Sequence, residues 1–317
     1  MKKIFENKLV EINFILFPIW ILPLYFFTNN FFSAEVTFLI FLILLGESHF
    51  ASTFLFFFDN QNKDYIKNNK FILIYAPITI CILYFIFGLF YFEYAVLLGA
   101  IASGIHVTRQ SIGVSRIYTT ERKNFFEMLI YFSSFLFMFV GFYRFYDDGF
   151  NLLVNFFNLK TFFENYILIF INNKNFLIFI TIFLGSIALI EKTNYKKKLI
   201  NLTGVILYAP YCFVGNIYDA IIIGVGAHWS QYLLINYKVY FYKNNDVSKK
   251  IKNILFIIIY AITMSFIGYK QFFSNDFIKM LILIPMTGSF FHYYIDAFIW
   301  RFSIKEIREN IGSRLFA

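Results

Sequence analysis

Long apolar stretches alternate with short polar ones along most of the chain, and this pattern predicts membrane-spanning helices. Each stretch is about 16 to 25 residues long, close to the ~20 residues that a helix needs to cross a bilayer. Ten spans are expected, at residues 8–28, 35–58, 71–91, 94–117, 125–146, 175–191, 199–214, 217–241, 252–269 and 278–301. The fold class that follows is all-α, a polytopic transmembrane helical bundle forming a single integral membrane domain over residues 1–317.

Two stretches need a separate interpretation. Residues 151–174 mix apolar side chains with Asn155, Lys160 and Glu164, which indicates either an interfacial helix or a loop packed on the bundle. The first apolar stretch follows a short basic N-terminus and has no small-residue cleavage pattern. It is therefore expected to be a retained first span and not a signal peptide.

The basic residues follow the predicted topology. The connections after the second, fourth, sixth and eighth spans carry clusters of Lys and Arg, as do both ends of the chain. The connections after odd-numbered spans carry almost none. Since Lys and Arg are enriched in cytoplasmic loops, both termini are predicted to be cytoplasmic. The location that we expect, in view of the resemblance described below, is the inner membrane of a bacterial cell.

Composition supports the same class. Hydrophobic residues make up 59% of the chain and aromatic residues 23%, more apolar surface than a soluble domain of this size could bury. The net charge of +9 lies in the loops, so we expect membrane lipid and no nucleic acid as a partner. The two cysteines, Cys81 and Cys212, fall in apolar runs and are interpreted as core residues.

The chain has only four histidines, and each lies near the middle of an even-numbered predicted span: His49, His106, His228 and His292. Their four helices would then cross the membrane in the same direction. The scatter of about three residues in depth corresponds to about 4–5 Å along a helix. All four imidazoles are therefore expected in one layer, as ligands of a shared metal site.

Polar residues accompany each histidine at short spacing. They are candidates for supporting the liganding imidazoles or for contacting a substrate. Asp296 follows His292 by one helical turn, and an aromatic stripe beside it could line a substrate cavity. Ser52 and Thr53, three and four residues after His49, could support it in this way. The other candidates are Glu47, Arg109, Gln110, Gln231, Tyr294 and Asp296.

Several neutral imidazoles with few carboxylates suit iron, zinc or copper. The first hypothesis is a non-haem Fe(II) site that carries out oxidative chemistry on a long hydrophobic substrate delivered from the lipid phase. The second is two bis-histidine pairs that hold haem b without covalent attachment. The third is a transporter in which Glu47, Arg109 and Asp296 act with histidines as proton carriers.

The histidine stretches resemble the bacterial β-carotene 15,15′-dioxygenase family, also called the bacterio-opsin-related proteins. The last motif of that family is similar to the run from His292 through Asp296 to Arg301. Its third motif, a Tyr-Ala-Pro turn before a histidine helix, is similar to residues 208–210 followed by His228. Its first two histidine helices resemble residues 46–49 and 105–106.

This resemblance implies a membrane-embedded iron dioxygenase, an oxidoreductase of the kind that cleaves a carotenoid to retinal. It also implies that the four histidines hold the iron. The sequence departs from the family pattern at two points. Ser48-His49-Phe50 stands where the family has Pro-His-Gly, and Tyr232 stands where the third motif usually has a second histidine.

Overall fold

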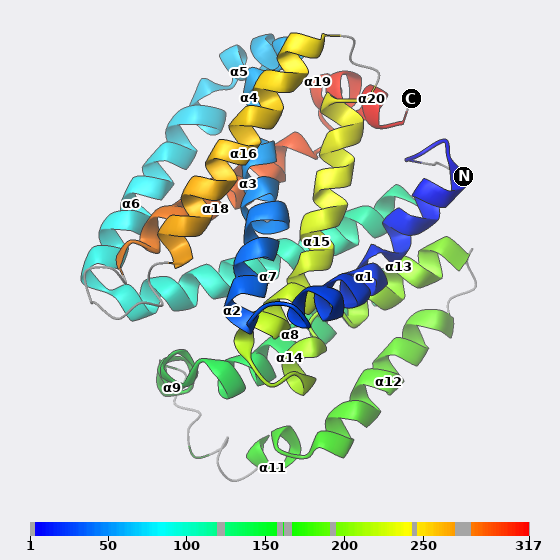
Figure 1. The fold of residues 1–317 in the computed structure, drawn as a ribbon, viewed down its shortest axis with the longest axis vertical. Helices are drawn as coiled ribbons and strands as arrows, with labels where there is room; N and C mark the ends of the chain where they lie inside the picture. The colour runs from blue at the N-terminus through cyan, green and yellow to red at the C-terminus, as the bar shows by residue number, and fades with distance from the viewer. Residues whose placement is uncertain are drawn as a thin grey trace. The chain divides into compact units, whose positions relative to one another are not determined.

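The structure, a computed structural model, describes residues 4–118, 124–156, 161, 167–190, 195–242, 246–269 and 280–316. Helices are the only regular elements in these ranges (Figure 1), which confirms the all-α prediction. Three of the helical segments, η1, η3 and η6, have the wider π-type turn.

The first half of the chain contains α1 (Lys8–Asn29), α2 (Ala34–Phe41), η1 (Leu42–Glu47), α3 (Ser48–Thr53), α4 (Leu55–Phe58), η2 (Asn60–Asn62), α5 (Lys63–Asn68), η3 (Phe71–Tyr75), α6 (Ala76–Phe90), α7 (Phe92–Ile117), α8 (Asn124–Phe145) and α9 (Asp147–Phe156). The second half contains α11 (Leu168–Ile171), α12 (Lys174–Ile190), α13 (Tyr195–Val205), α14 (Pro210–Phe213), α15 (Ile217–Tyr240), α16 (Val247–Tyr269), α18 (Leu283–Ile299), α19 (Lys305–Ile307), η6 (Arg308–Gly312) and α20 (Ser313–Leu315).

Most predicted spans coincide with a helix to within a few residues, but one does not. The predicted continuous span 199–214 is wrong, because α13 ends at Val205 and α14 starts only at Pro210. Because a proline has no backbone N–H, Pro210 cannot continue the hydrogen-bond ladder of α13, and it stands instead in the first turn of α14. The last predicted span is shorter than expected, since α18 starts at Leu283. Residues 157–160, 162–166, 278 and 279, which two of the predictions included, lie outside the described ranges.

Four helical stretches are long and apolar enough to cross a membrane: Ala34–Thr53, Phe71–Phe90, Phe125–Phe145 and Val247–Gly268. A fifth is added if the bent helix α1 counts as one span. These apolar helices suggest a membrane protein by their length and composition. Helices α7 and α15, 26 and 24 residues long, are not among the four stretches and carry more polar residues. The ten spans and the cytoplasmic termini therefore stay predictions.

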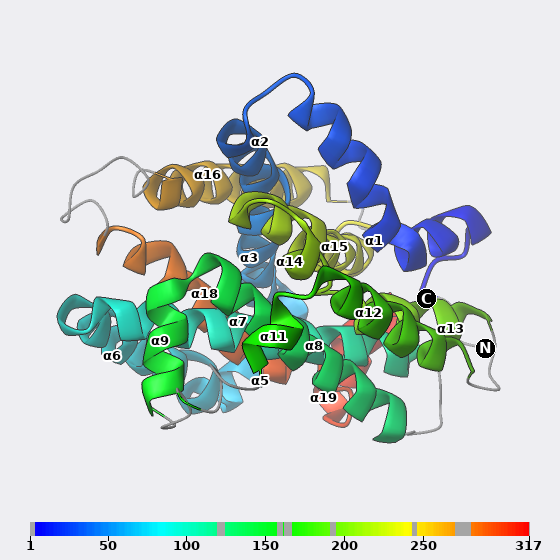
Figure 2. The same cartoon turned by 90° about the horizontal axis from the view of Figure 1, so that it is seen from below.

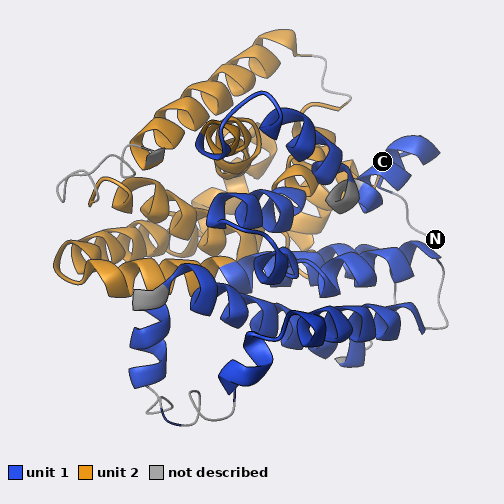
Figure 3. Ribbon diagram, turned by 60° about the horizontal axis from the view of Figure 1, so that its bottom comes forward, with its two compact units in different colours: residues 1–35, 104–228 blue, residues 36–103, 229–317 orange. Residues whose placement is uncertain are grey.

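The chain divides into two compact units (Figure 3). Unit 1 comprises residues 1–35 and 104–228, and unit 2 comprises residues 36–103 and 229–317. The boundaries at residues 103/104 and 228/229 fall within helices, since α7 passes from unit 2 to unit 1 and α15 passes back. The expectation of one integral domain stays a prediction.

In unit 1, α13 packs against α1, α8 and α12. A fully buried Glu11 on α1 accepts a hydrogen bond of 2.9 Å from the Phe5 backbone N–H and pairs with the Lys196 Nζ at 3.4 Å. In the last turn of α8, the Arg144 guanidinium donates to the carbonyl oxygens of Tyr211 and Val214 at 2.7 and 2.9 Å. One polar link therefore joins α1 to α13, and another joins α8 to α14.

In unit 2, α6 and α18 lie side by side in both views (Figures 1 and 2), and α16 packs along η1 and α3. The close approach of α18 to α6 depends on Gly88, where an added Cβ would lie 2.6 Å from the Leu283 side chain. The buried Asp59 carboxylate pairs with Arg314 on α20 at 2.6 Å and with Lys249 on α16 at 3.3 Å, and so links these two helices. This packing places α3 and α18, which each carry one histidine, in contact.

Candidate metal centre

In unit 2, His49 on α3 and His292 on α18 form a buried pair. Both side chains are 0% exposed, and their ring centroids are 4.3 Å apart with the rings close to perpendicular. The Phe50 and Tyr232 rings contact His292, with centroids 5.1 and 5.2 Å from it. Two imidazoles in an aromatic shell without bulk water are costly unless hydrogen bonds or a metal compensate for their lost hydration.

A change of helix type precedes His49. The six residues Leu42–Glu47 adopt π-type turns, and the Ser48 hydroxyl then donates to the Ile43 carbonyl at 2.7 Å. Wide turns of this kind insert one residue into a helix and are frequent at functional sites. Gly46 lies in the same segment, where an added Cβ would be 2.9 Å from the end of the Leu42 side chain and 3.4 Å from the Trp229 ring. A side chain at this position would therefore require the Leu42 side chain to shift.

A hydrogen-bonded chain holds His292. The Thr53 hydroxyl lies 2.6 Å from His292 Nδ1 and 2.9 Å from the Tyr232 hydroxyl, and Tyr232 donates to Asp296 Oδ1. Because the Tyr232 proton goes to Asp296, Thr53 donates to the Tyr232 oxygen and accepts from Nδ1–H of His292. This tautomer places the lone pair of His292 on Nε2, so a metal bound to His292 would take Nε2. Asp296 Oδ2 lies 3.6 Å from the same nitrogen.

A second set of hydrogen bonds supports His49 through its backbone. The Ser52 hydroxyl donates to the His49 carbonyl oxygen at 2.7 Å, and the Asn236 amide donates to the Ser52 oxygen at 2.8 Å. Asn236 is buried on α15, as is Ser52 on α3. These contacts fix the position of the α3 backbone that carries His49.

In unit 1, His106 on α7 and His228 on α15 form the second pair, with ring centroids 5.3 Å apart and perpendicular planes. Gly104 precedes His106, and its carbonyl oxygen accepts hydrogen bonds from the hydroxyls of Thr108 and Tyr208 at 2.7 and 3.4 Å. A Cβ at Gly104 would lie 2.0 Å from the terminal methyl group of Met138. Gly104 therefore leaves room for the Met138 side chain to pack on α7 beside His106.

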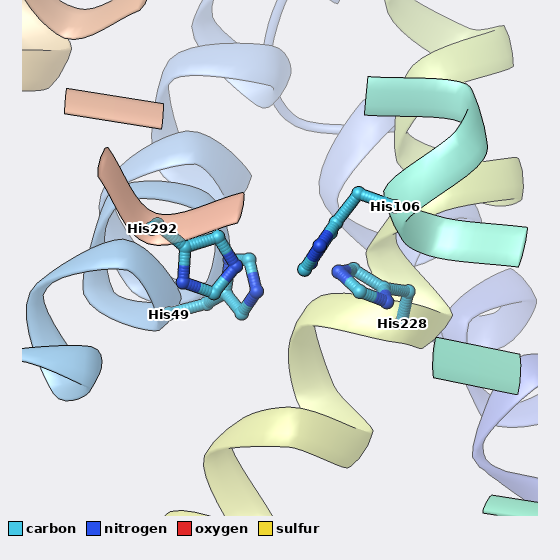
Figure 4. Close-up of side chains that lie close together, drawn as sticks. All are labelled: His49, His106, His228 and His292. Carbon is cyan, nitrogen blue, oxygen red and sulfur yellow. The ribbon is translucent and has the colours of Figure 1, made fainter. Parts of the chain in front are cut away.

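The four histidines lie close together. One ring nitrogen from each lies within 4.8 Å of the corresponding nitrogens of the other three. Figure 4 shows the rings of His49 and His292 beside each other and those of His106 and His228 beside each other. Imidazole nitrogens are common ligands of zinc, copper and iron, so this group could bind a metal ion.

The other candidate residues lie in different surroundings. Glu47, Gln231 and Asp296 are buried, and the Gln110 amide group is buried without a hydrogen-bond partner among the described residues. Arg109 is exposed on α7, one turn beyond His106. Tyr294 is half-buried and packs on Phe298 with ring centroids 5.1 Å apart. Asp296 lies beside His292 and accepts the hydrogen bond of Tyr232 in the chain that holds this histidine.

The sequence predicts that Thr53 supports His49, four residues before it, whereas in the structure Thr53 bonds to His292 on another helix. Tyr232 is absent from the candidates derived from the sequence, although it follows His228 by four residues. Residues at this spacing lie on the same face of a helix. Tyr232 also occupies the position where the resembling family has a histidine, and here its hydroxyl bonds to Thr53 and Asp296.

Replacing Thr53 by valine is expected to weaken metal binding. Valine has nearly the same shape but cannot accept the Nδ1–H of His292, so the ring loses the partner that fixes its tautomer. Removing such a supporting hydrogen bond typically lowers metal affinity by about 10–100-fold. Metal competition titrations of the purified protein and the variant measure this, and an unchanged affinity would show that Thr53 does not support a ligand.

Comparison of the chain with protein-family models, with curated proteins and with solved structures finds no match.

Proposed function

We propose that this protein is a membrane-embedded, histidine-ligated metalloenzyme, a non-haem iron oxygenase that acts on a long hydrophobic isoprenoid or lipid. The observation that carries the proposal is the convergence of the only four histidines of the chain, which come from four different helices. Such a grouping in an apolar interior is expensive to maintain without a ligand that uses it.

The ring geometry within each unit supports ligation of one metal. With metal–nitrogen bonds of about 2.1 Å, two imidazole centroids lie about 4.5 Å apart when the bonds are perpendicular and about 5 Å apart at a tetrahedral angle. The observed distances are 4.3 Å for His49–His292 and 5.3 Å for His106–His228. Each pair therefore has the spacing of two adjacent ligands on the same ion.

The same distances disfavour two haem groups. Axial imidazoles lie on opposite faces of a haem, which separates their centroids by more than about 6 Å when each iron–nitrogen bond is about 2 Å. Both observed pairs are closer than this, and perpendicular contact between the His49 and His292 rings leaves no gap for a porphyrin. A non-haem ion is therefore the better fit to these residues.

The surface of unit 2 supports a substrate from the lipid phase. Large apolar side chains are exposed along α6 and α16, among them Leu83 at 62%, Phe90 at 76% and Ile259 at 63%. A surface of this kind is stable only against hydrocarbon, so long hydrophobic molecules dissolved in the membrane have direct access to these helices. The resemblance of the histidine stretches to carotenoid-cleaving enzymes favours an isoprenoid within this class.

An iron ion held by neutral imidazoles would supply dioxygen chemistry. The described residues supply the rest of the site: Thr53 and Asp296 orient His292, and Ser52 and Asn236 fix the backbone at His49. The aromatic rings of Phe50 and Tyr232 exclude water from the imidazoles of unit 2. Exclusion of water strengthens the electrostatic interactions within a site and suppresses side reactions.

Metal analysis combined with an optical spectrum of the purified protein tests this proposal. The expected result is about one iron per chain, as for a mononuclear site, without the Soret band of haem. A Soret band would favour bis-histidine haem. A folded protein that takes up neither iron nor haem would refute both, and would favour a transporter in which the buried Glu47 and Asp296 carry protons.

A further inference from the structure

Arg109 differs from the other arginines in the described part of unit 1. Arg116 forms a bidentate pair with Glu127, at 2.8 and 2.7 Å, and Arg144 donates to two backbone carbonyls. Arg109 is exposed on α7, and the described part of the chain provides no carboxylate that pairs with it. It carries a full positive charge on a helix of a membrane protein, where an uncompensated cation is costly.

The level of Arg109 in unit 1 follows from its neighbour Arg116. The Arg116–Glu127 pair joins the C-terminal part of α7 to the N-terminal part of α8. Since Phe125–Phe145 is one of the four stretches able to cross a membrane, this pair marks one end of the membrane-crossing part of α8. Arg109 lies seven residues before Arg116, about 10 Å along the helix. Its long side chain can reach back from that depth to the headgroup region.

The exposed surface of α8 is apolar, and the exposed surface of α7 beyond Arg109 is free of large side chains at Gly113. Four large side chains of α8 are exposed at helical spacing: Phe125, Met128, Phe132 and Phe135. On α7, Gly113 follows Arg109 by one turn, and nothing lies within 4 Å of the position of an added Cβ. Unit 1 therefore presents a cation and a bare helix surface on α7 and an apolar face on α8, and the Arg116–Glu127 pair joins these two helices.

We propose that Arg109 binds the phosphate of an anionic phospholipid, whose acyl chains lie along the exposed face of α8. Charge complementarity selects this occupant. Glu127 is neutralised by Arg116, so Arg109 leaves the surface with a net positive charge that a phosphate compensates. Arginine donates two parallel N–H bonds to phosphate oxygens, which fixes the headgroup as well as attracting it. The proposal does not depend on a metal and is separate from the proposed function.

Native mass spectrometry of the full chain in detergent tests the proposal, with phosphatidylglycerol and phosphatidylcholine of identical acyl chains as probes. The wild-type protein is expected to retain phosphatidylglycerol about fivefold better, since one basic residue near a membrane surface contributes about 1 kcal/mol to anionic lipid binding. Arg109→Gln is expected to abolish this preference. Arg308→Gln, which removes one charge from an exposed position in η6 of unit 2, is the matched control and is expected to keep it.

Three outcomes would overturn the proposal. Equal retention of the two lipids by the wild-type protein would exclude selection by charge. An unchanged preference in Arg109→Gln would place the lipid site elsewhere. Displacement of phosphatidylglycerol by millimolar inorganic phosphate alone would show an anion site that does not need acyl chains. Metal content measured on the same samples keeps these outcomes distinct from failure of the proposed function.

Discussion

Replacing His292 by alanine is expected to reduce the bound metal from about one ion per chain to nearly none, given the four-ligand coordination usual for histidine-rich sites. The substitution removes one imidazole and also leaves the Thr53 hydroxyl and Asp296 without the ring that they orient. The substitution also leaves a cavity at a position that is 0% exposed, which removes packing contacts and lowers stability. Both effects act at the site, whereas the packing of α18 on α6 rests on other residues, such as Leu283 against Gly88.

The measurement is metal per chain by mass spectrometry, together with circular dichroism to establish that the helices have formed. Tyr294→Phe is the matched control, because Tyr294 lies on the same helix and packs on Phe298. This variant is expected to keep its metal and its helix content. Full metal content in His292→Ala would show that His292 is not a ligand. Loss of metal in both variants would indicate a general defect in α18.

The extent of most helices could be predicted from hydropathy alone, because the length of an apolar run is a local property. Helices α7 and α15 follow their predicted spans although their polar residues lower their hydropathy. The failure at 199–214 is equally local. The sequence contains Pro210, but the apolar run around it is as long as a membrane span. The prediction followed the length of the run and not the proline.

The grouping of the histidines could be predicted for a different reason. A polar side chain in the middle of an apolar helix is costly where it faces lipid. Four histidines at similar positions in such helices are therefore expected to face one another. The division of the chain into two units, with His49 and His292 in one and His106 and His228 in the other, left no trace in the sequence. That division depends on which helices are in contact. The periodicity of a helix predicts its apolar face but does not predict which helix packs against that face.

The supporting residues show the same limit more sharply. Asp296 and Arg109 were selected on similar spacing, four residues after His292 and three after His106. In the structure Asp296 is buried beside His292 Nε2, whereas Arg109 is exposed. Thr53 is a candidate partner of His49 by spacing, yet it bonds to His292, which is 239 residues away in the chain. Spacing within one helix cannot detect contacts that another helix supplies.

The largest effect on stability is expected from Glu11→Gln in unit 1. Glu11 is 0% exposed and Lys196 is 4% exposed, and the carboxylate oxygens also accept the backbone N–H groups of Ile4 and Phe5. Glutamine keeps the size of the side chain but removes its charge, so the buried Lys196 ammonium loses the Glu11 carboxylate. Breaking a buried pair in this way costs about 3–5 kcal/mol.

Thermal unfolding in detergent is expected to show a decrease in midpoint of about 10 °C for Glu11→Gln, at about 2–4 °C per kcal/mol for a protein of this size class.

The double variant Glu11→Leu with Lys196→Leu separates the contribution of charge from that of packing. Replacing a buried ion pair by apolar residues is often neutral, so the double variant is expected to unfold near the wild-type temperature. If the double variant is as unstable as Glu11→Gln, the contribution of Glu11 comes instead from its bonds to Ile4 and Phe5, which leucine also removes. If Glu11→Gln unfolds at the wild-type temperature, Lys196 does not depend on the Glu11 charge, and α13 is held against α1 by apolar contacts alone.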